Sequence, residues 1–281
     1  MSYPIGFTAG MNIHAYPSSL SDGQWLLLQP LLPPPAKRGR KTKDRRLILD
    51  GIFYVLRAGC AWRMMPRDFG PWSTVYDVYR KWAKSGLWKQ IHDTLRHLVR
   101  KAAGKLSQPS AAALDSQSVK MADQGGESGF DAGKRIKGRK RHLLVDTLGL
   151  LLGVCVTSAA IQDRDGAVQL LSSHFLTYWR LAVVWVDSAY RGLLVEWVKG
   201  LRPFGRLHLE VVSKLPGQKG FSLLRKRWIV ERTFSWLLKW RRLRCDYEHK
   251  TEHSEAWIYL AMTGVMLRRL SKAKTGIKLQ K

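Results

Sequence analysis

Three acidic residues are unusual because each lies in an otherwise apolar segment. Asp115 lies within AAALDSQSV, Asp187 ends LAVVWVD, and Glu231 lies within RWIVERTF. Each has an ordinary alternative role: Asp115 in a turn, Asp187 as a helix cap, and Glu231 paired with Arg227 one turn earlier. A buried carboxylate nevertheless needs compensation, and converging carboxylates are what two divalent ions about 4 Å apart require for phosphoryl transfer. The sequence therefore predicts Asp115, Asp187 and Glu231 as catalytic and metal-binding residues.

Other acids have better structural explanations. Asp146 begins the segment DTLG, which has the Asp-first, Gly-fourth pattern of a tight turn. Asp163 and Asp165 precede an expected helix, where carboxylates serve as caps. Asp165 is kept as a substitute for a member of the triad only if one of the three fails.

The apolar pattern changes after residue 110 and predicts the elements that position these acids. In order they are a strand at 111–119, a hairpin at 139–156, a helix at 165–175, a strand at 181–187, a helix at 189–200, a strand at 207–213 and a helix at 221–243. The order βββαβαβα is that of a ribonuclease H-like core, whose mixed sheet has the first strand at its centre. We therefore expect an α+β or α/β fold.

The first hundred residues are expected to be helical. Helices are predicted from Ser21 or Asp22 to the prolines at 33–35, over 47–59, from Ser73 or Thr74, and from Gly86. The predicted domains are an unstructured leader at 1–17, a helical DNA-binding domain at 18–105 and a catalytic domain at 106–281. The helical core is expected to use Trp62, Trp72, Trp82 and Trp88.

Charge and composition restrict the class of partner. The chain has 281 residues, 48 Lys and Arg against 21 Asp and Glu, and a formal charge of +27. This excess implies nucleic acid rather than a membrane surface, because it is spread along the chain with 12 Trp. Three distant cysteines offer neither a disulfide framework nor a zinc motif. No segment is predicted to cross a membrane, so a cytoplasmic, DNA-associated location is expected.

Basic residues cluster in three segments, which are the expected phosphate contacts. They are Arg38, Arg40, Lys41, Arg45, Arg46, Arg139, Lys140, Arg141, Arg227, Arg232, Lys239, Arg241 and Arg242.

Several longer motifs resemble one known family over residues 20–270. The N-terminal motifs are QWLLLQPLLPPP, GRKTKDRRLILDGIFYVLRAGCAWRMMPRDFGPWSTVY and KSGLW; the C-terminal ones are LDSQSVK, DAGKRIKGRKRHLLVDTLGLLLGV, DRDGA, VWVDSAYRG and RWIVERTFSWLLKWRRLRCDYE. The chain resembles the DDE transposases of bacterial insertion sequences, in the insertion-sequence-five family of the broader insertion-sequence-four-like group.

The resemblance places the three family acids on Asp115, Asp187 and Glu231. The broader group also carries a Tyr-x2-Arg-x3-Glu-x6-Lys pattern on the last catalytic helix. Arg227 and Glu231 match that pattern, whereas Leu224 and Leu238 stand at the Tyr and Lys positions. Whether Lys239 replaces the missing Lys is left open.

The resemblance implies cleavage at the ends of an insertion sequence and transfer of the 3′-hydroxyl into target DNA. It implies two Mg²⁺ ions, with Mn²⁺ as an alternative ion, double-stranded DNA ends and target as partners, and a homodimer in the active DNA complex. Two alternatives keep the same fold and charge: a catalytically inactive or domesticated DNA-binding protein, and a ribonuclease H-like nuclease without strand transfer.

Overall fold

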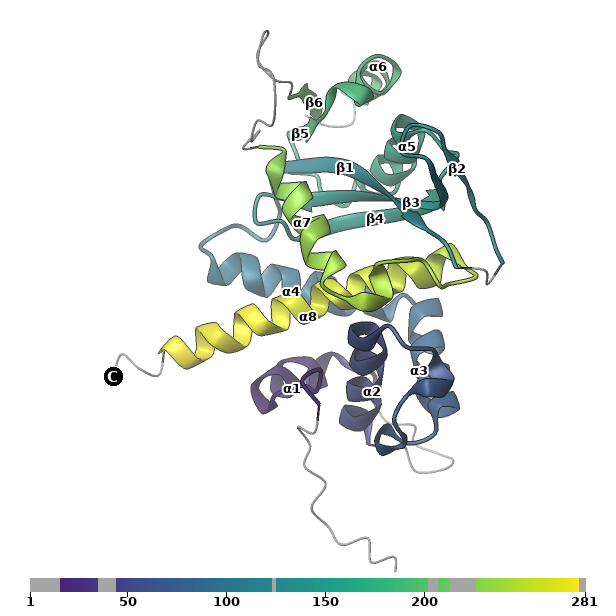
Figure 1. The fold of residues 1–281 in the computed structure, drawn as a ribbon. Helices are drawn as coiled ribbons and strands as arrows, with labels where there is room; N and C mark the ends of the chain where they lie inside the picture. Colours follow the sequence, from purple (N-terminus) through teal and green to yellow (C-terminus); the bar gives the residue numbers. More distant parts are fainter. Residues whose placement is uncertain (1–15, 35–43, 123–124, 202–206, 213–225, 278–281) are drawn as a thin grey trace, which may run out of the picture.

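A mixed sheet packed between helices organises the molecule (Figure 1). The computed structural model describes residues 16–34, 44–122, 125–201, 207–212 and 226–277. The helices are α1 Asp22–Leu28, α2 Arg45–Ala58, α3 Trp72–Lys84, α4 Leu87–Ala102, α5 Asp163–His174, α6 Leu193–Gly200, α7 Trp228–Leu238 and α8 Thr251–Ile277. The strands are β1 Ala111–Lys120, β2 Gly129–Asp131, β3 Ile136–Asp146, β4 Leu151–Ser158, β5 Val183–Val186 and β6 His208–Val211. Short 3₁₀ turns are η1 Gln29–Leu31, η2 Trp62–Met64, η3 Arg67–Phe69, η4 Ser188–Tyr190 and η6 Arg241–Leu243.

Strand β1 occupies the middle of the sheet, as the sequence predicts. The order is β2-β3-β1-β5-β6, and β4 also pairs with β3. β1 is antiparallel to β3 and parallel to β5, which is parallel to β6. This mixed sheet, with helices before and after it, confirms the expected fold class and its ribonuclease H-like core.

Alternate residues of β1 face two different hydrophobic layers, because side chains along a strand alternate between the sheet's faces. Ala112 and Leu114 join a core formed with α5 and α6. Ala113 joins the larger core, which includes α7 and α8. Asp115 follows the same alternation onto the face of Ala113, which is the face that α7 covers.

The long helix α8 is an element that the sequence analysis missed. It contacts α1, α3, α4 and β4, and Figure 1 shows it lying between the sheet and the helices α1, α2 and α3. Residues of α2, α4, β3 and α8 belong to one continuous apolar core. The helical layer is therefore built from both ends of the described chain.

Several helix limits differ from the prediction; α6, for example, begins at Leu193 where a helix from 189 was predicted. α3 begins at Trp72 after Pro71, because proline favours the start of a helix. α5 begins at Asp163, with Gln162 as its N-cap. The predicted helix at 221–243 is observed as Trp228–Leu238, while residues 221–225 lie outside the described ranges.

The end of α7 has a tertiary cause. Trp240 is in an extended conformation and is 3% exposed, and its ring packs 6.3 Å from that of Phe53. A Cβ on Gly264 would approach that indole to 2.8 Å. Burying this ring between α2 and α8 therefore turns the chain out of the helix.

A pH-dependent stability is expected from the contact between α8 and β4. The Glu255 carboxylate accepts the Val156 N–H at 3.0 Å, and burial raises its pKa from 4.5 to about 7. A carboxyl that is more easily protonated when folded favours the folded state below pH 4.5, and this advantage is lost as pH rises through 7. Glu255→Gln should therefore stabilise the protein at pH 8 by at most about 3 kcal/mol and change little at pH 4.

Urea unfolding at the two pH values measures this difference. The matched control is Glu196→Gln, because Glu196 is exposed on α6. An equal effect of Glu255→Gln at pH 4 and pH 8 would contradict the assignment.

Candidate active site and basic surface

The parallel pairing of β1 and β5 brings two of the three predicted acids together. Ala113 is opposite Trp185 in that register. Two residues further along each strand, the same register leads to Asp115 and Asp187. The two carboxylates therefore lie beside one another at the carboxyl end of β5, where open α/β sheets usually bind ligands.

Local backbone contacts orient both carboxylates. Asp115 Oδ1 accepts the Ser116 N–H at 2.7 Å, and Asp187 Oδ1 accepts the Ala189 N–H at 2.9 Å as the N-cap of η4. Burial raises the pKa of Asp115 from 3.8 to about 6; the Ser116 N–H and Arg227 lower it, while Asp187 raises it. The negative charge at this position is thus incompletely compensated by the protein.

Glu231 joins this pair through Arg227. The Arg227 guanidinium lies 2.8 Å from Glu231 Oε1 and 3.8 Å from Asp187 Oδ2. Arg227 also acts electrostatically on Asp115. The structure therefore gathers all three predicted acids around one cation, and the ordinary pairing of Glu231 with Arg227 is present as well.

The β3–β4 turn positions the helix that carries Glu231. The Thr233 hydroxyl donates to Gly149 O at 2.9 Å, and Arg232 donates to Leu148 O at 3.1 Å. Gly149 has a φ of +76°, and a Cβ there would meet Thr233 and Trp236 at 3.0 Å. Glycine therefore permits both the turn and the close approach of α7.

The donor chemistry of the triad fits a hard divalent cation, which prefers carboxylate oxygens. Two of the three carboxylates currently pair with Arg227. Within the described part of the chain, no three acidic, histidine or cysteine side chains stand close enough together to hold a metal ion.

A second buried ionic cluster lies on the opposite face of β1. Lys140 Nζ lies 2.9 Å from Asp163 and 3.5 Å from Asp131. Ser116 donates to Asp163 at 2.8 Å, and Ser118 donates to Asp131. These contacts support the strand that carries Asp115. The sequence signal was the alternation of Ser116 and Ser118 after Asp115. Their hydrogen-bond partners lie on α5 and β2, and Lys140 of β3 pairs with both acids.

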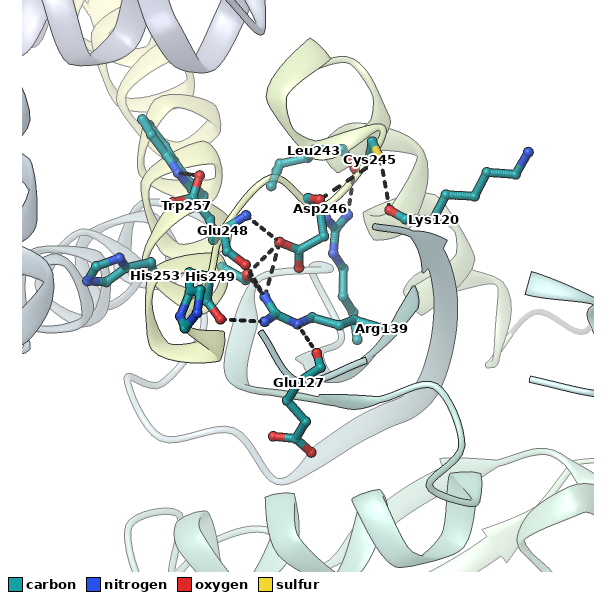
Figure 2. Close-up of polar contacts among 12 residues, drawn as sticks. Lys120, Glu127, Arg139, Leu243, Cys245, Asp246, Glu248, His249, His253 and Trp257 are labelled. Carbon is teal, nitrogen blue, oxygen red and sulfur yellow. Dashed lines mark hydrogen bonds and ion pairs between the residues drawn. The ribbon is translucent and has the colours of Figure 1, made fainter. Parts of the chain in front are cut away.

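Arg139 does not face solvent, and the prediction that it contacts phosphates is wrong. Figure 2 shows its guanidinium enclosed by the segment before α8. It donates to Glu127 O at 2.9 Å, Glu248 O at 2.7 Å and His249 O at 2.8 Å, and lies 3.3 Å from Asp246. Its exposure is 0%, so Arg139 ties β3 to the start of α8.

Three further residues that were predicted to contact DNA are also buried and bonded within the protein. Arg141 is buried and donates to Leu243 O at 2.6 Å, and Lys140 is buried in the cluster behind β1. Arg242 is buried and bonds Glu248 at 2.6 Å. Like Arg139, these side chains are not available to phosphates.

Other predicted contacts occupy the surface. Lys239 and Arg241 are exposed, while Arg232 lies 5.0 Å from the Trp228 ring and 4.9 Å from the Trp236 ring. Arg45 donates to Pro33 O, and Arg46 pairs with Asp22 at 2.7 Å. Arg38, Arg40 and Lys41 lie outside the described residues.

Comparison with known proteins identifies the family of the chain. The model of the "Transposase DDE domain" matches residues 106–266, more than half of the chain, and that of the "Putative transposase of IS4/5 family" matches residues 20–92. The chain belongs to the DDE transposases. Its insertion-sequence character follows from the IS4/5 model, and members of this family generally use divalent metal ions.

Three curated relatives cover parts of the chain. The "Insertion element IS402 uncharacterized 16.2 kDa protein" of Burkholderia cepacia is 35% identical over 39% of this chain and 78% of its own length. The "Putative transposase for insertion sequence element IS402" of the same organism is 28% identical over 48% of this chain and 66% of its own length. "Uncharacterized protein y4sN" of Sinorhizobium fredii is 32% identical over 30% and 65%, respectively. No helix among the described residues is long and apolar enough to span a membrane.

The structural role of Arg139 leads to a test. Arg139→Met should destabilise the protein by roughly 3–5 kcal/mol, because it leaves Asp246 buried without its cation. The salt dependence of DNA binding should stay at the wild-type value at a temperature where the variant is folded. Urea unfolding and a salt titration of duplex binding measure the two effects.

Lys239→Gln is the matched surface control, with the opposite expectation of unchanged stability and a weaker salt dependence. A stable Arg139→Met protein that shows a reduced salt dependence would contradict the structural role.

Proposed function

We propose that this transposase cleaves DNA at the ends of an insertion sequence and joins the freed 3′-hydroxyl to target DNA by two-metal-ion phosphoryl transfer. The observation that carries the proposal is the convergence of Asp115 and Asp187 from adjacent parallel strands, with Glu231 linked to them through Arg227. A binding protein without catalysis has no need for a poorly compensated carboxylate at this position.

The proposed reaction consists of two phosphoryl transfers. In the first, a water oxygen bonds to phosphorus and loses a proton to solvent, and the P–O3′ bond breaks. The departing O3′ takes up a proton from solvent, leaving a 3′-hydroxyl and a 5′-phosphate. In the second, that 3′-hydroxyl oxygen bonds to a target phosphorus and displaces a target 3′-hydroxyl. Each step exchanges one P–O bond for another, so no covalent protein intermediate is needed.

The residues have distinct proposed roles. Asp115 and Asp187 would hold the ions from the sheet, and Glu231 would complete the site from α7. When bound there, two Mg²⁺ ions, or Mn²⁺ in their place, would stabilise charge on the phosphate oxygens and lower the pKa of a water molecule. Arg227, released from the carboxylates, would then face the phosphate with its planar set of donors.

DNA binding is assigned to the remaining exposed cations and the N-terminal helices. Arg232, Lys239 and Arg241 lie on or directly after the helix that carries Glu231. We assign recognition of the insertion-sequence ends to residues 18–105 and catalysis to residues 106–281. Because a reaction joins two ends, we propose that two copies act together in the DNA complex.

A reaction on defined DNA tests the chemistry. The substrate is a duplex carrying the inverted repeat that flanks the coding sequence, incubated with Mg²⁺ and a target plasmid. The wild-type protein should give nicked and joined products, whereas Asp115→Asn, Asp187→Asn and Glu231→Gln should give neither. Each variant should still bind the duplex in EDTA, because its basic surface is unchanged.

Asp77→Asn is the control, because Asp77 is an exposed carboxylate on α3. Nicked but unjoined wild-type products would indicate a nuclease without strand transfer, and the absence of products would indicate a binding protein. Activity that survives in one triad variant would remove that residue from the catalytic set.

A further inference from the structure

A pocket of about 390 Å³ lies where the N-terminal helices meet the segment after α7. Four of its lining residues are cations: Arg57 at the end of α2, and Lys239, Arg241 and Arg244 after α7. In the described ranges no carboxylate lines this pocket, which we call the α2–α7 basic pocket. A concentration of positive charge without acidic partners favours an anionic ligand.

Two of the cations are held in place by the backbone. Arg57 Nη1 donates to Lys239 O at 2.8 Å, and Arg244 Nε donates to Leu238 O at 3.2 Å. Arg57 also lies 5.8 Å from the centre of the buried Trp240 ring. A guanidinium has five N–H donors, so these contacts orient each group and leave further donors for a ligand.

Capping of α7 explains only part of this arrangement. Cations at a helix C-terminus stabilise its last carbonyl groups, which accounts for the contacts of Arg57 and Arg244. It does not account for the exposed Lys239 and Arg241 beside them. Arg268 adds another positive charge on Trp240, at 5.1 Å from the ring, so the cations here exceed what capping requires.

We propose that the α2–α7 basic pocket binds a backbone phosphate of the DNA strand on which the triad acts. This inference rests on the proposed function for the identity of the ligand. Lys239 follows Glu231 by eight residues, which is about 12 Å along a helix. For a strand that runs along α7, at roughly 3.4 Å per nucleotide, the bound phosphate would lie about three to four nucleotides from the cleaved bond.

The pocket also connects the two parts of the chain. Arg57 belongs to the N-terminal helices, whereas the other three cations directly follow the helix of Glu231. A phosphate held between them sets the position of the DNA relative to both parts. The pocket thereby sets the distance along the DNA between the recognised end and the cleaved bond.

Binding of a 20-base-pair duplex of arbitrary sequence, measured in EDTA over a series of salt concentrations, tests the pocket without any cleavage. Each phosphate contact contributes about 0.9 to the slope of log K against log salt. Arg57→Gln/Arg244→Gln should lower that slope by about this amount. The charge-retaining Arg57→Lys/Arg244→Lys protein should keep a slope near wild type.

Two single variants of this protein make the result decisive. Arg241→Gln removes a pocket charge without a capping contact and should lower the slope even if the double variant unfolds. Arg180→Gln removes an exposed cation beside Trp179, in the segment between α5 and β5, and should leave the slope unchanged. A wild-type slope in Arg241→Gln overturns the proposal, whether or not the protein cuts DNA.

Neutral methylphosphonates in the inverted-repeat duplex test the spacing. A substitution three or four nucleotides from the cleaved bond should weaken binding by the wild-type protein but add nothing in Arg241→Gln. Equal losses of binding affinity in the wild-type and Arg241→Gln proteins at those positions would overturn the proposed spacing. The cleaved bond is located with the wild-type protein, whereas the salt titration in EDTA needs no cleavage and tests the pocket even if the cleavage assay fails.

Discussion

The pairing of β1 with β5 is the constraint on which the site depends. A shift of that register by one residue would turn one acid to the opposite face of the sheet. Apolar residues on both faces of β1 oppose such a shift, because Ala112 and Leu114 fill one core and Ala113 fills the other. The geometry of the carboxylates is therefore determined by hydrophobic packing, and their own electrostatic interactions act against it.

Buried arginines stabilise the fold, a role that the net charge of the sequence does not reveal. Arg139 and Arg141 lie within a sheet strand, where their desolvation is offset by backbone carbonyls from the segment before α8. Hydrogen bonds with an ionised donor are stronger than those between neutral groups. Part of the large positive charge thus holds separate segments of the protein together, and only the remainder is available to nucleic acid.

The local pattern of apolar and turn-forming residues predicted the central strand, the β3–β4 hairpin and the positions of Asp115 and Asp187. Such patterns are informative because the alternation of side chains and the formation of turns depend on residues close together in the chain. The local pattern could not predict which cations are buried, since every acceptor of Arg139 except Glu127 O is more than a hundred residues away in the chain. The end of α7 was missed for a similar reason: the cavity for Trp240 is supplied by α2 and α8. Non-local packing decided these features.

The position of α8 has a consequence for the order in which the molecule can form. Helices α1, α3 and α4 pack against α8, which a ribosome makes after every other described element. At about 5–20 residues per second, the interval between α1 and the start of α8 is roughly 10–45 s. During that time the N-terminal helices expose part of their core. Until α8 is made, a nascent chain therefore exposes this apolar surface to chaperones and proteases.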